Sequence, residues 1–148
     1  MPKVELFFDS SALIAGIASK TGGAAQTLLR LAEIKKIDII VSEQVVAEVE
    51  RNLAHKFPQA LPFGREIIRT CMAKIVRDPT LEDVKEHLDW MSHAADVPIL
   101  LAAVQAGVGH LVTLNTRHFI DDPGVAQRSG LIISTPGDAL VKIRELVK

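Results

Sequence analysis

Val4-Glu5-Leu6-Phe7-Phe8-Asp9 is the stretch that decides the fold, since it predicts a short buried strand that ends at a carboxylate. Strands without strict polar alternation are typical of parallel sheets that are covered on both faces. In open α/β sheets, ligands bind beyond the carboxyl ends of the strands. An aspartate at this position therefore predicts a binding site at the edge where the strands end.

The rest of the chain alternates between strand-like and helix-like segments. Three further apolar runs predict strands over residues 37–41, 110–114 and 131–134. Helices are expected over residues 12–19, 24–36, 43–55, 65–75, 80–92, 97–106 and 136–147, with residues 55–64 as a connection and a loop before the last strand. This order predicts an α/β fold with a parallel central sheet. Residues 1–148 are expected to form a single domain.

Composition restricts the classes of partner. The chain of 148 residues has a net charge of -1, without the basic excess that is typical of nucleic-acid-binding proteins. Any phosphate-binding surface must therefore be a local patch. The single cysteine, Cys71, excludes an internal disulfide and a cysteine-based zinc site, and it fits a cytoplasmic location. We expect no N-terminal signal, because residues 1–5 lead directly into a strand, and no membrane span.

Four polar side chains beside the apolar runs predict a metal site. They are Asp9, Glu48, Asp96 and Asn115. Carboxylate and amide oxygens favour hard cations, here Mg²⁺ or Mn²⁺. Each residue also has an ordinary interpretation: Asp9 and Asp96 as helix caps, Glu48 as a solvated helix residue, and Asn115 as a turn residue. Ser10 or Ser11 can cap the first helix instead, which would leave Asp9 for metal.

Basic residues near Asn115 are candidates for phosphate contacts. Arg117 and His118 lie two and three residues after it, although a surface pair would look the same. Three further candidates for a basic rim are Arg51, His55 and Lys56. The five histidines, at 55, 87, 93, 110 and 118, show no zinc-type spacing. No glycine-rich phosphate loop is present.

Four motifs that contain these residues occur in order along the chain. They are the segments 7–14 (FFDSSALI), 42–49 (SEQVVAEV), 96–103 (DVPILLAA) and 111–119 (LVTLNTRHF). With them, the chain resembles the PIN domain, a family of metal-dependent ribonucleases, over nearly its whole length. The resemblance implies a three-layer α/β/α fold with a central parallel sheet and an acidic pocket at the carboxyl ends of the strands.

The resemblance also implies roles for individual residues. Asp9, Glu48 and Asp96 occupy the family's metal-binding positions, and Asn115 stands where many members carry a fourth acidic residue. We expect Asp9 and Asp96 to be direct ligands of Mg²⁺ or Mn²⁺, and Glu48 to ligate through water or to orient the attacking water. Asn115 would position a water or a phosphate oxygen. Three neighbouring carboxylates should raise the pKa of at least one of them.

The expected substrate contacts complete the site. They are Ser10, Thr113, Arg117 and His118.

The function that this resemblance implies is metal-dependent endoribonuclease activity on RNA phosphodiester bonds. Small stand-alone members of the family include toxins that are blocked by a small antitoxin protein, and a homodimer is common among them. A non-catalytic PIN-fold module that binds RNA or protein is the alternative, kept open by Asn115. A metal-dependent phosphatase or a receiver-like domain is disfavoured, because Asp9 is not part of an acidic pair.

Overall fold

A single parallel sheet forms the centre of the protein, whose structure is a computed structural model that describes residues 3–20 and 22–146. Within these residues the sheet has five strands in the order β3-β2-β1-β4-β5. They are β1 (Val4–Phe8), β2 (Ile37–Ser42), β3 (Met72–Val76), β4 (His110–Val112) and β5 (Ile132–Ser134). The predicted α/β fold with a parallel central sheet is confirmed.

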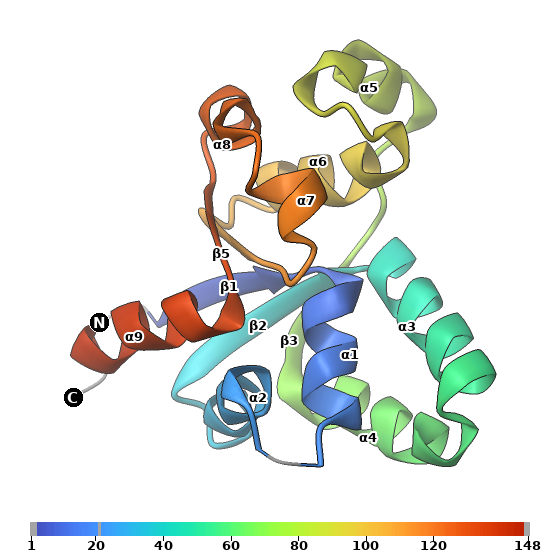
Figure 1. The fold of residues 1–148 in the computed structure, drawn as a ribbon, viewed down its shortest axis with the longest axis vertical. Helices are drawn as coiled ribbons and strands as arrows, with labels where there is room; N and C mark the ends of the chain where they lie inside the picture. Colours follow the sequence, from blue (N-terminus) through green and yellow to red (C-terminus); the bar gives the residue numbers. More distant parts are fainter. Residues whose placement is uncertain (1–2, 21, 147–148) are drawn as a thin grey trace.

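Helices cover both faces of this sheet (Figure 1), so the chain has three layers. One layer contains α1 (Ser10–Ala18), α2 (Ala24–Glu33), α3 (Glu43–Lys56), α4 (Leu61–Cys71) and α9 (Pro136–Leu146). The other contains α5 (Leu81–Glu86), α6 (Val97–Gln105), α7 (Thr116–Phe119) and α8 (Pro123–Ser129). Short 3₁₀ turns occur at Pro58–Ala60, Leu88–Trp90 and Ala94–Asp96. None of the described helices is long and apolar enough to cross a membrane.

Strand β1 lies in the middle of the sheet and of the core. Leu6, Phe7 and Phe8 have no exposed surface. Successive side chains of a strand point to opposite faces, so a run buried at every position requires cover on both sides. Full burial of each such side chain stabilises the fold by about 1.5–3 kcal/mol. The apolar run that leads to Asp9 is therefore explained by the two helical layers.

Strand β3 was not predicted from the sequence. The helix expected over residues 65–75 begins earlier, at Leu61, and ends at Cys71, after which the chain turns into β3. This strand lies at the edge of the sheet, and its Lys74 and Ile75 are exposed. An edge strand with one solvated side has no continuous apolar run, so the pattern that revealed β1 is missing here.

Two other segments differ from the prediction. The helix expected over residues 80–92 ends at Glu86 and continues as the 3₁₀ turn Leu88–Trp90. The expected loop after Asn115 contains the short helices α7 and α8. Helices of one or two turns are too short to show the periodicity by which longer helices are recognised.

Candidate metal centre

Asp9 lies where β1 ends, and its carboxylate is almost completely buried, with 3% of the residue exposed. Its Oδ1 accepts hydrogen bonds from the Ser11 hydroxyl at 2.7 Å and from the backbone N–H of Ala12 at 2.9 Å. Its Oδ2 accepts a hydrogen bond from the Thr113 hydroxyl. Asp9 is thus itself the N-cap of α1, so the prediction that Ser10 or Ser11 provides the cap was wrong.

Burial raises the pKa of Asp9 above its ordinary value. The hydrogen bonds from Thr113, Ala12 and Ser11 lower this pKa again, and the negative charge of Asp96 raises it slightly further. We expected mutual repulsion among carboxylates to raise a pKa at this site. The rise does occur at Asp9, but its main cause is the loss of hydration, and repulsion by Asp96 contributes less.

One oxygen of Asp9 has room for a further partner. An ionised carboxylate offers about two acceptor positions on each oxygen. Oδ1 already has two donors, whereas Oδ2 has, among the described residues, only the Thr113 hydroxyl. A cation would therefore bind to Oδ2, and it would compensate a buried charge that the surrounding groups stabilise only in part.

Thr113 follows β4 directly and is fully buried. Its hydroxyl donates to Asp9 and accepts from the backbone N–H of Asn115 at 2.9 Å, while the N–H of Leu114 donates to the Ser11 hydroxyl at 2.9 Å. These bonds tie the turn after β4 to the first turn of α1. Thr113, for which a substrate contact was predicted, is buried in this structure and its hydroxyl positions Asp9.

Glu48 is contributed by α3 and is half-buried against α1. Its Oε1 accepts from the Ser10 hydroxyl at 2.8 Å, and its Oε2 accepts from the Gln44 side-chain amide at 2.9 Å. The same amide lies 3.5 Å from the carbonyl of Ala95, which directly precedes Asp96. Glu48 is therefore directed inward. Gln44 was missed by the sequence analysis, although its position one turn before Glu48 on the same helix face indicated it.

Asp96 occupies the N-cap position of α6, but its side chain makes no capping bond. Its Oδ2 lies 2.7 Å from Nδ1 of His118 instead, so the interpretation as a cap is wrong. Asn115 caps α7 by accepting from the N–H of His118 at 3.4 Å. The Asn115 amide nitrogen also lies 2.9 Å from Nδ1 of His118. Because that nitrogen can donate to Asp96 or accept from Asn115 but not both, the two contacts compete.

Two histidines meet at Asp96, which the sequence spacing did not predict. The rings of His93 and His118 are stacked, with their centroids 4.0 Å apart and their planes 20° apart. Potential ligand atoms of His93, Asp96 and His118 all lie within 4.8 Å of one another. Among the described residues, no other three His, Cys, Asp or Glu side chains, Asp9 and Glu48 included, come together so closely. His93 and Asp96 belong to one short segment, whereas His118 lies 22 residues after Asp96, so no local spacing could reveal that His118 joins them.

The donor set fits a divalent cation. Asp9, Glu48, Asp96 and Asn115 supply carboxylate and amide oxygens, which Mg²⁺ and Mn²⁺ prefer. Ser10, Ser11, Gln44 and Thr113 hold these side chains in place by hydrogen bonds. Asp9 lies at the end of β1 and Asn115 just after β4, the neighbouring strand. The chemistry of these donors suits a cation at the carboxyl edge of the sheet, although within the described residues the ligand atoms of Asp9, Glu48 and Asp96 do not all lie within 4.8 Å of one another.

A groove of about 490 Å³ begins beside these residues. Its lining includes Ser10, Ser11, Lys56, Phe57 and Leu114. Lys56 and Phe57 are exposed, so the groove offers a cation and an aromatic ring next to the side chains that hold Asp9 and Glu48. Such a pair can contact a phosphate and a nucleobase.

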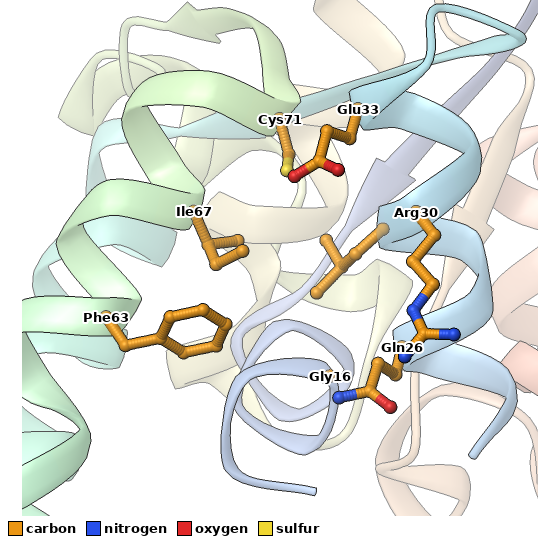
Figure 2. A pocket seen from close by; sticks show the side chains of 8 residues that line it. Gly16, Gln26, Arg30, Glu33, Phe63, Ile67 and Cys71 are labelled. Atoms are coloured by element: carbon orange, nitrogen blue, oxygen red, sulfur yellow. The ribbon is translucent and has the colours of Figure 1, made fainter. Parts of the chain in front are cut away.

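Another cavity, of about 180 Å³, lies between α1, α2 and α4 (Figure 2). Phe63 and Ile67 of α4 face Gln26, Arg30 and Glu33 of α2 across it. None of the predicted site residues lines it. The buried thiol of Cys71 does, and burial raises the pKa of that thiol. With Glu33 as its single carboxylate, this cavity is a poor candidate for a metal site.

Comparisons with known proteins address the fold and the family of the chain. No curated protein sequence matches the chain significantly. Among solved structures, the chain is similar to PAE2754 from Pyrobaculum aerophilum, with 18% identity, a TM-score of 0.66 and 96% of each chain covered. It is also similar to VapBC2 from Rickettsia felis, solved with a DNA fragment from its promoter, with 17% identity, a TM-score of 0.62, and 89% of this chain and 98% of that chain covered.

A third similar structure is the toxin VapC20 from Mycobacterium tuberculosis, described as cleaving the sarcin-ricin loop. It shares 16% identity with a TM-score of 0.55, over 75% of this chain and 90% of that chain. At such identities these three structures establish the fold. The family model described as PIN domain matches residues 5–117, which include all the predicted site residues up to Arg117. The chain therefore belongs to the PIN domain family.

Proposed function

We propose that this protein is a metal-dependent endoribonuclease that hydrolyses RNA phosphodiester bonds. Asp9, Glu48 and Asp96 would hold Mg²⁺ or Mn²⁺, and Asn115 would assist them. The observation that carries the proposal is Asp9, a buried carboxylate at the end of the central strand with an acceptor position left on Oδ2. Membership of the PIN domain family, whose members are typically metal-dependent nucleases, supports it.

In this proposal the side chains of the site divide the work. A bound divalent cation supplies an acidified water and compensates the negative charge that develops on the phosphate oxygens. Asp9 and Asp96 act as direct ligands. Glu48, held at both oxygens by Ser10 and Gln44, accepts a hydrogen bond from the attacking water and orients it. Asn115 positions a water or a phosphate oxygen.

RNA would approach along the groove beside Ser10. Lys56 can contact a phosphate there, and Phe57 can stack on a base, which suits a single-stranded or unpaired segment. Arg117 is exposed on α7 next to the half-buried His118, and both are candidates for further phosphate contacts. That VapC20 is described as a toxin that cleaves the sarcin-ricin loop supports RNA as the substrate class.

We further propose that the protein is the toxin of a toxin–antitoxin pair and acts in the cytoplasm, with a small antitoxin as its partner and a homodimer as its functional form. The likeness to VapBC2 and VapC20 supports this subtype. Expression in a bacterial host should then arrest growth, and the Asp9→Asn variant should relieve the arrest. Equal growth of cells that express wild type and cells that express Asp9→Asn, at equal protein levels, would contradict the toxin assignment.

The ribonuclease activity is tested with purified protein and a labelled, structured RNA in Mg²⁺, in Mn²⁺ and in EDTA. We expect cleavage with either metal and none in EDTA or with Asp9→Asn. Asp38→Asn is the matched control, because Asp38 lies on β2 near its amino end, where it pairs with Lys3 at 3.8 Å. RNA binding without cleavage by a folded protein would instead select the non-catalytic binding module.

A further inference from the structure

We propose that His93, Asp96 and His118 form a binding site for a transition-metal dication of the Co²⁺–Zn²⁺ class, and that this site prefers such an ion to Mg²⁺. The inference goes beyond the proposed nuclease, which needs only oxygen ligands. It rests on the proposed function only for the role that Asp96 would have in both.

The three side chains are already close enough to share one ion. Their potential ligand atoms lie within 4.8 Å of one another, and Oδ2 of Asp96 is 2.7 Å from Nδ1 of His118. Two ligand atoms at about 2.1 Å from a tetrahedral ion are roughly 3.4 Å apart. The distances are therefore compatible with coordination after shifts of about an ångström.

The donor chemistry favours a transition metal. Two imidazoles and one carboxylate suit Zn²⁺, Co²⁺, Ni²⁺ and Fe²⁺, whereas Mg²⁺ takes oxygen ligands and gives up its bound water reluctantly. Three protein ligands also leave a coordination position open for water or substrate. Asp96 contributes its carboxylate to either type of ion, so the two histidines determine the preference.

The position of His93 distinguishes a metal site from a simple ion pair. A pair of Asp96 and His118 needs no third residue, yet a second imidazole is stacked on His118. His93 is exposed, and within the described residues this stacking is the one contact shown for its ring. Its ring can therefore turn toward an ion without breaking a hydrogen bond of the fold, while His118 and Asp96 are half-buried and contact each other.

The site is tested by metal binding to the full chain in the absence of RNA. Co²⁺ and Mg²⁺ are titrated into metal-free protein and followed by calorimetry and, for Co²⁺, by visible absorption. The variants are His93→Gln and His118→Gln. The matched control is His55→Gln, which removes an exposed histidine of α3 that lies outside the cluster.

We expect the wild-type chain to bind one Co²⁺ and to bind it more tightly than Mg²⁺. His93→Gln and His118→Gln should each weaken Co²⁺ binding about tenfold or more, because even residues behind the ligands change metal affinity by that much. The affinity for Mg²⁺ should change little, and His55→Gln should behave as wild type. His118 makes hydrogen-bond contacts inside the fold, so His118→Gln could fail to fold. In that case the test depends on His93→Gln, because His93 is exposed.

Unchanged Co²⁺ affinity in folded His93→Gln, or Mg²⁺ binding as tight as that of Co²⁺, would overturn the site. This failure is distinguishable from failure of the nuclease proposal. If Co²⁺ binding depends on the histidines but RNA is not cleaved with any metal, the histidine site is supported and the nuclease proposal is refuted. If RNA cleavage depends on Mg²⁺ but neither His93→Gln nor His118→Gln changes the affinity for Co²⁺, the nuclease proposal stands and the histidine site is refuted.

Discussion

The two halves of the candidate site are built in opposite ways. Asp9 is buried at the end of a central strand, and three donors from the chain fix its carboxylate. The half around Asp96 lies on short helices and turns, and its members are half-buried or exposed. The fold thus supplies one rigid, poorly solvated ligand and a second group that can adjust. A charge that is costly to bury is best compensated by a ligand that arrives from the accessible side.

The largest effect expected from this comparison is the loss of activity in Asp9→Asn. We expect RNA cleavage to fall about a hundredfold or more, because the cation's stabilisation of transition-state charge is worth several kcal/mol. The amide retains the shape of the carboxylate and can still accept from Ala12. The measurement is the single-turnover cleavage rate with saturating Mn²⁺. A melting curve checks that the variant is folded, and a rate within a factor of about two of wild type would show that Asp9 serves only as a helix cap.

The buried carboxyl should also impose a pH dependence on the metal-free protein. Since the pKa of Asp9 is raised on folding, the folded chain holds this proton at a pH where the unfolded chain has released it. The free energy of unfolding should therefore fall as the pH rises from about 4 through the raised pKa, by up to about 1.4 kcal/mol per pH unit, and then level off.

Denaturant unfolding at a series of pH values in EDTA measures this trend. Asp9→Asn should remove that part of the pH dependence and should be more stable than wild type at neutral pH without metal. Added Mn²⁺ should stabilise wild type more than the variant, since it binds the ionised carboxylate. Identical pH profiles for the two proteins would refute a raised pKa at Asp9.

Asp9 and β1 could be predicted from sequence, whereas the histidine cluster could not. An apolar run that stops at Asp9 is a local pattern, and burial on both faces explains it. The approach of His93 to His118 depends on how separate segments pack, which leaves no periodicity or spacing in the chain. Strand β3 was missed for a different reason, since an edge strand with exposed Lys74 has too weak a local pattern.

Capping residues were harder to assign than strands, because one side chain can perform two tasks. Asp9 is both the cap of α1 and the best candidate ligand, so the two interpretations that competed in the sequence do not exclude each other. Asp96 stands at a cap position without capping, because His118 engages its carboxylate. An aspartate just before a helix can therefore be recognised in the sequence, but the group that its carboxylate binds cannot.

Thr113→Val should act mainly on the rigid half around Asp9. Valine has nearly the same shape but cannot donate to Asp9, and the Asn115 N–H loses its acceptor. We expect the free energy of unfolding at neutral pH to fall by about 1.5–3 kcal/mol, the usual value of a hydrogen bond to a charged group. In Asp9→Asn the same substitution should cost less. Equal losses in both backgrounds would mean that the hydroxyl does not support the charge.

The smallest effect is expected for Asn115→Ala, which tests the adjustable half. The side chain is neutral, and it caps a helix of one turn through a 3.4 Å contact. Its removal should slow cleavage by about fivefold, the equivalent of one hydrogen bond of about 1 kcal/mol. Asn115→Asp restores a fourth carboxylate and should tighten Mg²⁺ binding. Should Asn115→Ala abolish cleavage while Asp9→Asn leaves it intact, the roles of the two halves would be reversed, because the neutral, accessible group would then carry the chemistry that we assign to the buried charge.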